Sequence, residues 1–174
     1  MSLVPRVAVL GAIVAILLAA VVGGCGSPGS PVDQGSPAPA FVVWTLDGRE
    51  TRLSDFKGKT VVLNVWATWC GYCQAEMPEL EAAYRDYRDQ GLVVLGVNAR
   101  ESQDLVRRYV NELGITFPIL LDTNGSISHA YRVQALPTTF FIDADGIIRG
   151  QMVGQLTKET LLKGIRIASK GSIQ

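Results

Sequence analysis

Cysteine and histidine are scarce in this chain, whose 174 residues include three cysteines and one histidine. A closed zinc site takes four ligands, mostly from these two residue types, so we expect neither a metal ion nor another cofactor. An excess of one charge is also missing, because sixteen Lys and Arg balance sixteen Asp and Glu. A phosphate-rich partner favours a basic excess, so we expect no nucleic acid partner.

Long hydrophobic runs are absent except near the N-terminus. Residues 7–22 form one unbroken apolar run, which is shorter than the roughly 20 residues that cross a bilayer. Arg6 precedes the run and small residues follow it, which is the pattern of a secretory signal. The exit, VGGC at residues 22–25, resembles a bacterial lipobox, in which the cysteine becomes the N-terminus and carries acyl chains. This reading accounts for the odd cysteine, Cys25, as a lipidation site.

We therefore expect three parts. Residues 1–24 are read as a signal peptide, residues 25–39 as a flexible tether rich in Gly, Ser and Pro, and residues 40–174 as the folded domain. An uncleaved N-terminal anchor is the alternative to lipidation at Cys25. Both readings place the domain outside the cytoplasm and attach it to the bacterial cell membrane.

The first half of the domain alternates strand and helix patterns. Two short extended runs within residues 41–56 flank the turn dipeptide Asp47-Gly48 and predict an N-terminal β-hairpin. The apolar runs 60–66 and 92–97 are typical of buried strands. The pattern between them predicts a helix over residues 71–90, so the three elements form a βαβ unit.

The second half adds an αβ piece and another hairpin. Ser102 and Gly114 favour the start and end of a helix, with a buried face of Leu105, Tyr109, Val110 and Leu113. The later patterns predict a strand over 117–121, a short helix within 127–133, an antiparallel hairpin from 138–143 and 147–154, and a last helix from about residue 157. This order predicts an α/β fold with a central mixed sheet flanked by helices.

Cys70 and Cys73 stand between the first buried strand and its helix, in the sequence WATWCGYCQAEMP. Reaction sites in open α/β sheets favour this edge, and the first turn of a helix stabilises a thiolate. A disulfide staple across four residues would add only about 2 kcal/mol. A metal site would have two thiolates and His129 as its only candidate ligands. We therefore favour redox exchange, with Cys73 one turn from Cys70 and able to attack a mixed disulfide there.

Residues 37–174 resemble the thioredoxin-fold reductases of the TlpA/ResA type, within the redoxin (AhpC/TSA) superfamily. The matching pieces occur in order and cover nearly the whole domain: residues 46–80, 91–98, 114–122, 130–146 and 152–154. The resemblance implies a thioredoxin-like fold with the predicted hairpin at its N-terminus and the αβ segment at residues 99–121 as an insertion.

The resemblance also implies roles for individual residues. Cys70 would be the exposed attacking cysteine and Cys73 the buried resolving one. The Leu136–Pro137 bond would be cis, beside the sulfurs, and would leave main-chain groups free to pair with an extended substrate. The residues expected to bind substrate are Trp69, Gly71, Tyr72, Leu136, Pro137 and Thr138.

Glu76 stands three residues after Cys73, on the same face of the helix. A carboxylate there could accept the proton of the resolving cysteine, and the TlpA/ResA type carries a glutamate at this position. Ordinary thioredoxins place an acid six residues before the first cysteine, where this chain has the neutral Asn64. The alternative is a solvated surface glutamate in the first turn of a helix.

The family resemblance suggests reduction of apocytochrome c before haem attachment, with electrons from a membrane dithiol carrier of the CcdA/DsbD kind. Other disulfide-bearing proteins are open as substrates. Two functions are alternatives to disulfide reduction. Copper delivery of the Sco kind uses C-x-x-x-C, one residue longer than the spacing here. Peroxidase activity of the peroxiredoxin kind uses P-x-x-x-T-x-x-C, which fits neither Cys70 nor Cys73.

Overall fold

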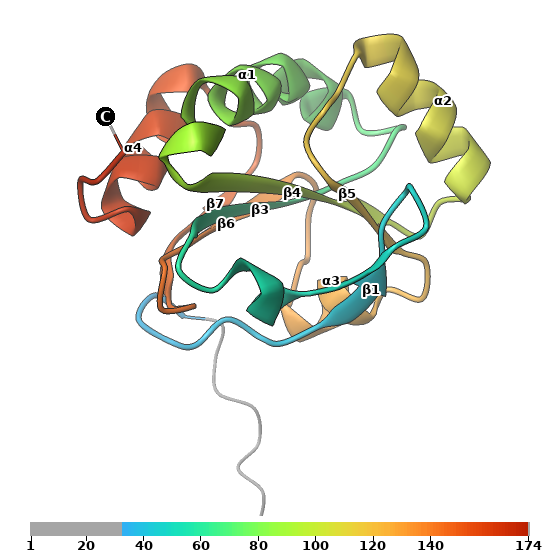
Figure 1. Ribbon diagram of the computed structural model, residues 1–174. Coiled ribbons are helices and arrows are strands. Elements are labelled where there is room, and N and C mark those ends of the chain that lie inside the picture. Colours follow the sequence, from blue (N-terminus) through green and yellow to red (C-terminus); the bar gives the residue numbers. More distant parts are fainter. Residues whose placement is uncertain (1–32, 174) are drawn as a thin grey trace, which may run out of the picture.

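A computed structural model of the protein describes residues 33–173. The fold consists of a two-stranded sheet, a five-stranded sheet and the helices that pack against the larger sheet (Figure 1). The elements in chain order are β1 (Val42–Trp44), β2 (Glu50–Arg52), the 3-10 turn η1 (Leu53–Phe56), β3 (Thr60–Trp66), α1 (Gly71–Tyr87), the 3-10 turn η2 (Arg88–Gln90), β4 (Leu92–Ala99), α2 (Gln103–Leu113), β5 (Ile119–Asp122), α3 (Ser126–Ala130), β6 (Thr138–Ile142), β7 (Ile148–Val153) and α4 (Lys158–Ala168).

The five-stranded sheet has the order β5-β4-β3-β6-β7. Strands β3, β4 and β5 pair in parallel, and β6 pairs antiparallel with both β3 and β7. Helices α1, α2 and α4 cover one face, whereas α3 and the β1–β2 hairpin lie on the other (Figure 1). The predicted mixed sheet flanked by helices is confirmed, and so are the N-terminal hairpin and the inserted αβ element.

Strand β3 runs through the centre of the sheet, and all seven of its residues are buried. Val62 and Trp66 belong to the hydrophobic cluster under α1 and α4. Val61, Leu63 and Val65 belong to the cluster on the opposite face. Because both faces are covered, the strand needs a continuous apolar run rather than an alternating one.

The predicted buried face of α2 is wrong at two residues. Leu105 and Leu113 are exposed, whereas Val106 and Val110 are buried. Val106 and Val110 are four residues apart and share one stripe of the helix, and Leu105 lies about 100° away from Val106 around the axis. A single helix on a sheet buries one such stripe, which accounts for the exposure of Leu105. Leu113 lies on the same side of the helix as Val106 but is the last residue of α2.

The predicted tether is also wrong at its C-terminal end. Residues 35–38 form main-chain hydrogen bonds at the start of β7, from Gly35 N to Ile148 O (2.8 Å) and from Ala38 N to Gly146 O (2.9 Å). The Tyr131 hydroxyl donates to Pro39 O at 2.9 Å. This segment therefore belongs to the folded domain, because its backbone covers part of an otherwise open strand edge.

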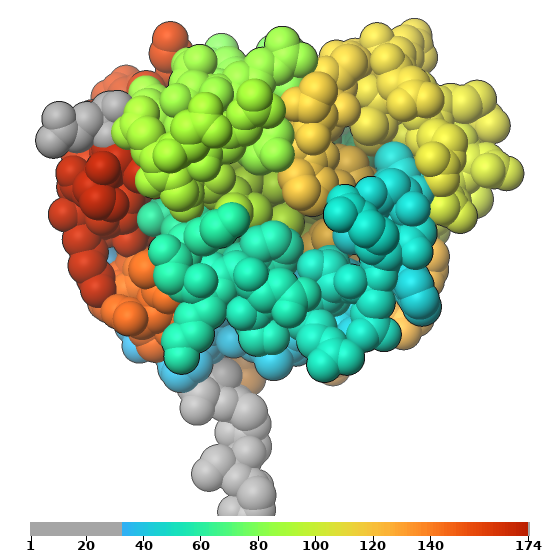
Figure 2. All heavy atoms as spheres, in the orientation of Figure 1, coloured from blue at the N-terminus to red at the C-terminus, as the bar shows by residue number. Residues whose placement is uncertain are grey.

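The signal peptide predicted at residues 1–24 and the lipidation site at Cys25 lie outside the described residues. Within residues 33–173, no helix combines the length and the apolar character needed to span a bilayer. Figure 2 shows the first part of the described chain, from blue to teal, covering the lower surface below the green helix α1.

Gly164 allows α4 to approach the sheet. A Cβ atom at this position would lie 2.3 Å from Cε1 of the buried Phe141 ring. We predict that Gly164→Ala lowers the free energy of unfolding by about 1–3 kcal/mol through overpacking, despite the better helix propensity of alanine. Chemical denaturation measures this change. Lys163→Ala, at the exposed neighbouring position, should change stability by less than about 0.5 kcal/mol, and equal effects of the two substitutions would contradict the packing argument.

Candidate active site

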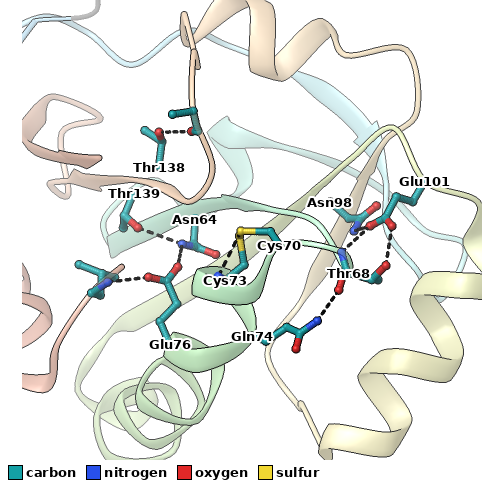
Figure 3. Close-up of a disulfide and its surroundings, with 12 residues drawn as sticks. Asn64, Thr68, Cys70, Cys73, Gln74, Glu76, Asn98, Glu101, Thr138 and Thr139 are labelled. Atoms are coloured by element: carbon teal, nitrogen blue, oxygen red, sulfur yellow. Dashed lines mark hydrogen bonds between the residues drawn. A yellow bond between two sulfur atoms is a disulfide. The ribbon is translucent and has the colours of Figure 1, made fainter. Parts of the chain in front are cut away.

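The turn between β3 and α1 places Cys70 at the N-terminus of the helix. Cys70 is the N-cap residue of α1, and its Sγ accepts the N–H of Cys73 at 3.2 Å (Figure 3). The two cysteines form a disulfide with their Cα atoms 5.2 Å apart. In the reduced protein the same N–H and the positive end of the helix dipole would stabilise a thiolate on Cys70.

The two sulfurs differ in access to solvent. Cys70 is 6% exposed and Cys73 is 0% exposed, so Cys70 is the more accessible cysteine, although the expectation that it is exposed is wrong for this disulfide form. Trp69 precedes Cys70, and Tyr72 lies between the two cysteines; their side chains are 71% and 68% exposed, whereas Trp66 is in the core. The disulfide thus has little solvent access, and two exposed aromatic residues lie next to Cys70 or within its motif in the sequence.

The segment before β6 reaches the same end of the sheet. The Leu136–Pro137 peptide bond is cis, which confirms the expectation from the family resemblance. Thr138 opens β6 and pairs in register with Val65 of β3, five residues before Cys70. Leu136 is half-buried, and Pro137 and Thr138 are buried. Proline carries no N–H, and the Pro137 carbonyl accepts Gly154 N at 2.8 Å.

Glu76 points from α1 into the sheet and is fully buried. Its Oε1 accepts Asn64 Nδ2 at 2.7 Å, and its Oε2 accepts Leu156 N at 2.6 Å (Figure 3). Burial raises the pKa of Glu76 to about 7, and the hydrogen bonds from Leu156 and Asn64 limit the rise. The alternative of a solvated surface glutamate is therefore wrong. A carboxyl group with a pKa near neutrality can both accept and release a proton there.

Asn64 links Glu76 to β6. Its Nδ2 donates to Thr139 Oγ1 at 2.9 Å as well as to Glu76, which uses both hydrogens of the amide. From the sequence alone, Asn64 is only a neutral residue at a position where ordinary thioredoxins carry an acid. The structure shows that this amide is the side chain that orients Glu76.

A second carboxylate, which the sequence does not predict, lies near the turn that carries the cysteines. Glu101, between β4 and α2, accepts hydrogen bonds from Thr68 and Asn98 (Figure 3). Its contact with Thr68 joins residues that are 33 positions apart in the chain. No motif signalled it, because the contact depends on how the inserted segment folds back over the turn before Cys70.

His129 does not join this site. It is exposed on α3, which lies on the face of the sheet opposite α1 (Figure 1). Within residues 33–173, no three His, Cys, Asp or Glu side chains come close enough together to hold a metal ion. The ligand set that a copper site would require, two thiolates and His129, is therefore not assembled by this fold.

The fold and the site define a thioredoxin-like protein whose chemistry is thiol–disulfide exchange between two cysteines at a helix start. The AhpC/TSA family matches residues 34–151, and the chain belongs to this family. It is similar to the thiol-disulfide oxidoreductase ResA of Geobacillus thermodenitrificans, with 44% identity over 130 residues that cover 75% of each chain. The chain is a ResA-like thiol-disulfide oxidoreductase.

Solved structures agree with this assignment. A thiol:disulfide interchange protein of the thioredoxin family from Chlorobium tepidum aligns with a TM-score of 0.71 and 28% identity, covering 78% of this chain and 97% of that one. The pneumococcal exposed lipoprotein thioredoxin Etrx1 from Streptococcus pneumoniae aligns with a TM-score of 0.66 and 30% identity, covering 74% and 98%.

The raised pKa of Glu76 predicts a dependence of stability on pH. The pKa rises from 4.5 to about 7 on folding, so the folded state binds this proton more tightly. Folding stability should therefore fall as the pH rises from about 4.5 to about 7, by up to about 3 kcal/mol. Glu76→Gln cannot titrate, so its stability relative to the wild type should increase through this window.

Denaturation of the oxidised proteins at pH 5 and pH 8 measures the effect. Glu76→Gln also loses one acceptor, but that loss does not depend on pH, so the difference between the two pH values isolates the titration. Glu79→Gln, at a half-buried position of the same helix, is the matched control and should follow the wild type. Parallel curves for the wild type and Glu76→Gln would contradict the argument.

Proposed function

We propose that this protein is a membrane-attached reductase of protein disulfides outside the cytoplasm, with oxidised apocytochrome c as its substrate. The observation that carries the proposal is the pairing of a helix-capping cysteine with a buried resolving cysteine and a buried carboxyl group of raised pKa. This set supplies a nucleophile, a second thiol and a proton acceptor within one helical segment.

The reaction begins with the reduced pair. The Cys70 thiolate attacks one sulfur of the substrate disulfide, and the other substrate sulfur leaves as a thiolate and takes up a proton. Cys73 then transfers its proton to ionised Glu76 and attacks Cys70 Sγ. The mixed disulfide breaks, the Cys70–Cys73 disulfide forms, and the second substrate sulfur leaves as a thiolate, which takes up a proton from Glu76 or from solvent. Two electrons have moved from the pair to the substrate.

The surface around Cys70 would receive the substrate. Trp69 and Tyr72 offer exposed aromatic area on either side of Cys70. Gly71 and the Leu136–Pro137–Thr138 segment complete the expected binding set, with the cis proline next to the first residue of β6. An extended peptide with a disulfide could lie across this segment and bring its sulfur to Cys70. The dipeptide Gly71-Tyr72 has no cation to stabilise a thiolate further, which favours the role of reductant.

A reductase outside the cytoplasm needs a source of electrons, because cytosolic reductants do not reach that compartment. A membrane dithiol carrier of the CcdA/DsbD kind fits this need, since attachment raises the effective concentration of the two partners. The N-terminal pattern that resembles a lipobox supports attachment at Cys25. The name of the similar pneumococcal protein, an exposed lipoprotein thioredoxin, adds support by analogy.

The point at which the N-terminal segment joins the sheet determines how Cys70 is oriented relative to the proposed membrane attachment. Residues 35–38 join the sheet at the start of β7, and the register Val61–Ile142–Ile148 places that point at the end of the sheet opposite Cys70. A domain attached there would turn its disulfide away from the point of attachment. Residues 25–34 could span at most about 35 Å, so the domain would need this length to reorient toward a carrier in the membrane.

Trapping tests the substrate assignment. A Cys73→Ser variant should hold its substrate in a mixed disulfide through Cys70, because the resolving thiol is missing. Mass spectrometry of the complexes, after acid quenching and alkylation of cells, should identify apocytochrome c. Cys70→Ser is the matched control and should trap none. Complexes that contain only other proteins would contradict the substrate, and complexes formed equally by both variants would contradict the role of Cys70.

Deletion of a CcdA/DsbD-type carrier tests the electron source. The Cys70–Cys73 pair should then accumulate as the disulfide, because oxidation continues without resupply of electrons. Alkylation with a large maleimide followed by gel electrophoresis reports the fraction of reduced pair. A Cys25→Ser variant in cells that retain the carrier should show partial oxidation if attachment supports the exchange. A pair that stayed reduced in the deletion strain would contradict this donor.

A further inference from the structure

Thr68 lies in the turn between β3 and α1, and its N–H, its hydroxyl and its carbonyl are all hydrogen-bonded. Its N–H donates to Glu101 Oε2 at 2.7 Å, and its hydroxyl donates to Glu101 Oε1 at 2.5 Å. Its carbonyl accepts Gln74 Nε2 at 2.7 Å (Figure 3). The main-chain N–H and the carbonyl of Thr68 are both hydrogen-bonded. The peptide groups on either side of Thr68 therefore cannot rotate without breaking at least one of these bonds. It stands two residues before Cys70.

Glu101 is itself fixed from the neighbouring strand. Its Oε2 also accepts Asn98 Nδ2 at 2.7 Å, and Asn98 is buried near the end of β4. Asn98 pairs in register with Trp66, the last residue of β3. The carboxylate of Glu101 therefore connects a buried residue of β4 to the turn that leaves β3.

We propose that Glu101 is a positioning residue for Cys70, acting through Thr68. The Sγ of Cys70 accepts the N–H of Cys73 because Cys70 holds the N-cap conformation, with φ −87° and ψ 105°. In the oxidised protein the disulfide restrains that conformation as well. After reduction the covalent restraint is gone, and the Thr68–Glu101 bonds and the hydrogen bond from Cys70 N to Ala67 O (3.2 Å) hold the turn. The hydrogen bonds between Thr68 and Glu101 therefore contribute most to the position of Cys70 in the reduced protein, which is the form that attacks the substrate.

The hydrogen bonds and the charge of Glu101 act on Cys70 in opposite directions. Holding the turn keeps Sγ aligned with the Cys73 N–H, which favours the thiolate. A negative charge near the turn disfavours a thiolate. Tyr72, Cys73 and Glu76 also carry ionisable side chains in the first turns of α1, and positions 72, 73 and 76 are identical in all the variants compared below. A substitution that removes the bonds together with the charge can therefore be distinguished from one that removes the charge but can keep bonds to Thr68.

The test is the pH profile of Cys70 alkylation in the reduced full-length chain in detergent, with Cys73→Ser as the common background. Glu101→Ala removes both the bonds and the charge. We expect it to raise the pKa of the Cys70 thiol by about half a unit, which lowers the alkylation rate near pH 7 about threefold and leaves the rate well above the pKa unchanged. Glu101→Gln removes the charge and one acceptor oxygen, but its remaining oxygen can still accept the Thr68 N–H and its amide can donate to the Thr68 hydroxyl. We expect it to leave the pKa unchanged or lower it.

The chain contains a matched control. Glu81 holds Thr116 by the same pattern, accepting its N–H at 2.8 Å and its hydroxyl at 2.6 Å, two helical turns beyond Cys73. Glu81→Ala should cost stability in the same way but leave the pKa of Cys70 unchanged. The proposal is overturned if Glu101→Ala leaves that pKa unchanged, if Glu81→Ala shifts it equally, or if Glu101→Gln raises it as much as Glu101→Ala does.

This inference rests on the proposed role of Cys70 as the attacking cysteine. The alkylation profile contains no protein substrate, so it reports the ionisation of Cys70 whichever substrate the protein reduces. A failure of the substrate assignment would appear in the trapping experiment and would leave the pKa shift intact. A failure of the Glu101 proposal would leave the trapping of substrate by Cys73→Ser intact.

Discussion

The hydrogen bond from the Cys73 N–H to Cys70 Sγ is the interaction on which the chemistry of this protein depends. It exists because the buried strand β3 ends at Trp66 and a helix begins at Gly71, so that Cys70 caps the helix. The fully buried strand fixes where the turn starts, and the free N–H groups of the first helical turn face the sulfur. The core thus determines the position of a reactive atom that lies at its edge.

Two carboxylates stand on either side of this turn and differ in environment. Glu76 is fully buried with two hydrogen bonds, and burial brings its pKa to about 7. Glu101 is half-buried and accepts three hydrogen bonds, two of them from Thr68. A buried acid with few donors is suited to exchange a proton, whereas an acid held by several donors is suited to hold a loop. The two environments therefore indicate two different roles.

The sequence predicted the parts of this protein that depend on local patterns. The apolar run 60–66, the helical pattern that begins at residue 71 and the Cys70–Cys73 spacing each identify one feature, and the structure contains β3, α1 and the disulfide. The cis bond before Pro137 required the family resemblance, because local preference does not favour it. The partners of Glu76 and Glu101 were not predictable, since Leu156 lies 80 residues from Glu76 and Thr68 lies 33 residues from Glu101. Such contacts follow only from tertiary packing.

The buried Glu76 explains why position 64 is an asparagine rather than an aspartate. Asn64 Nδ2 lies 2.7 Å from Glu76 Oε1 in a site without solvent access. An aspartate at position 64 would place two carboxylates at that distance, and both could not be ionised there. A neutral donor instead stabilises the ionised glutamate, and its second hydrogen ties the pair to Thr139. A proton acceptor on the helix thus requires an amide on the strand, which accounts for the departure from the thioredoxin pattern.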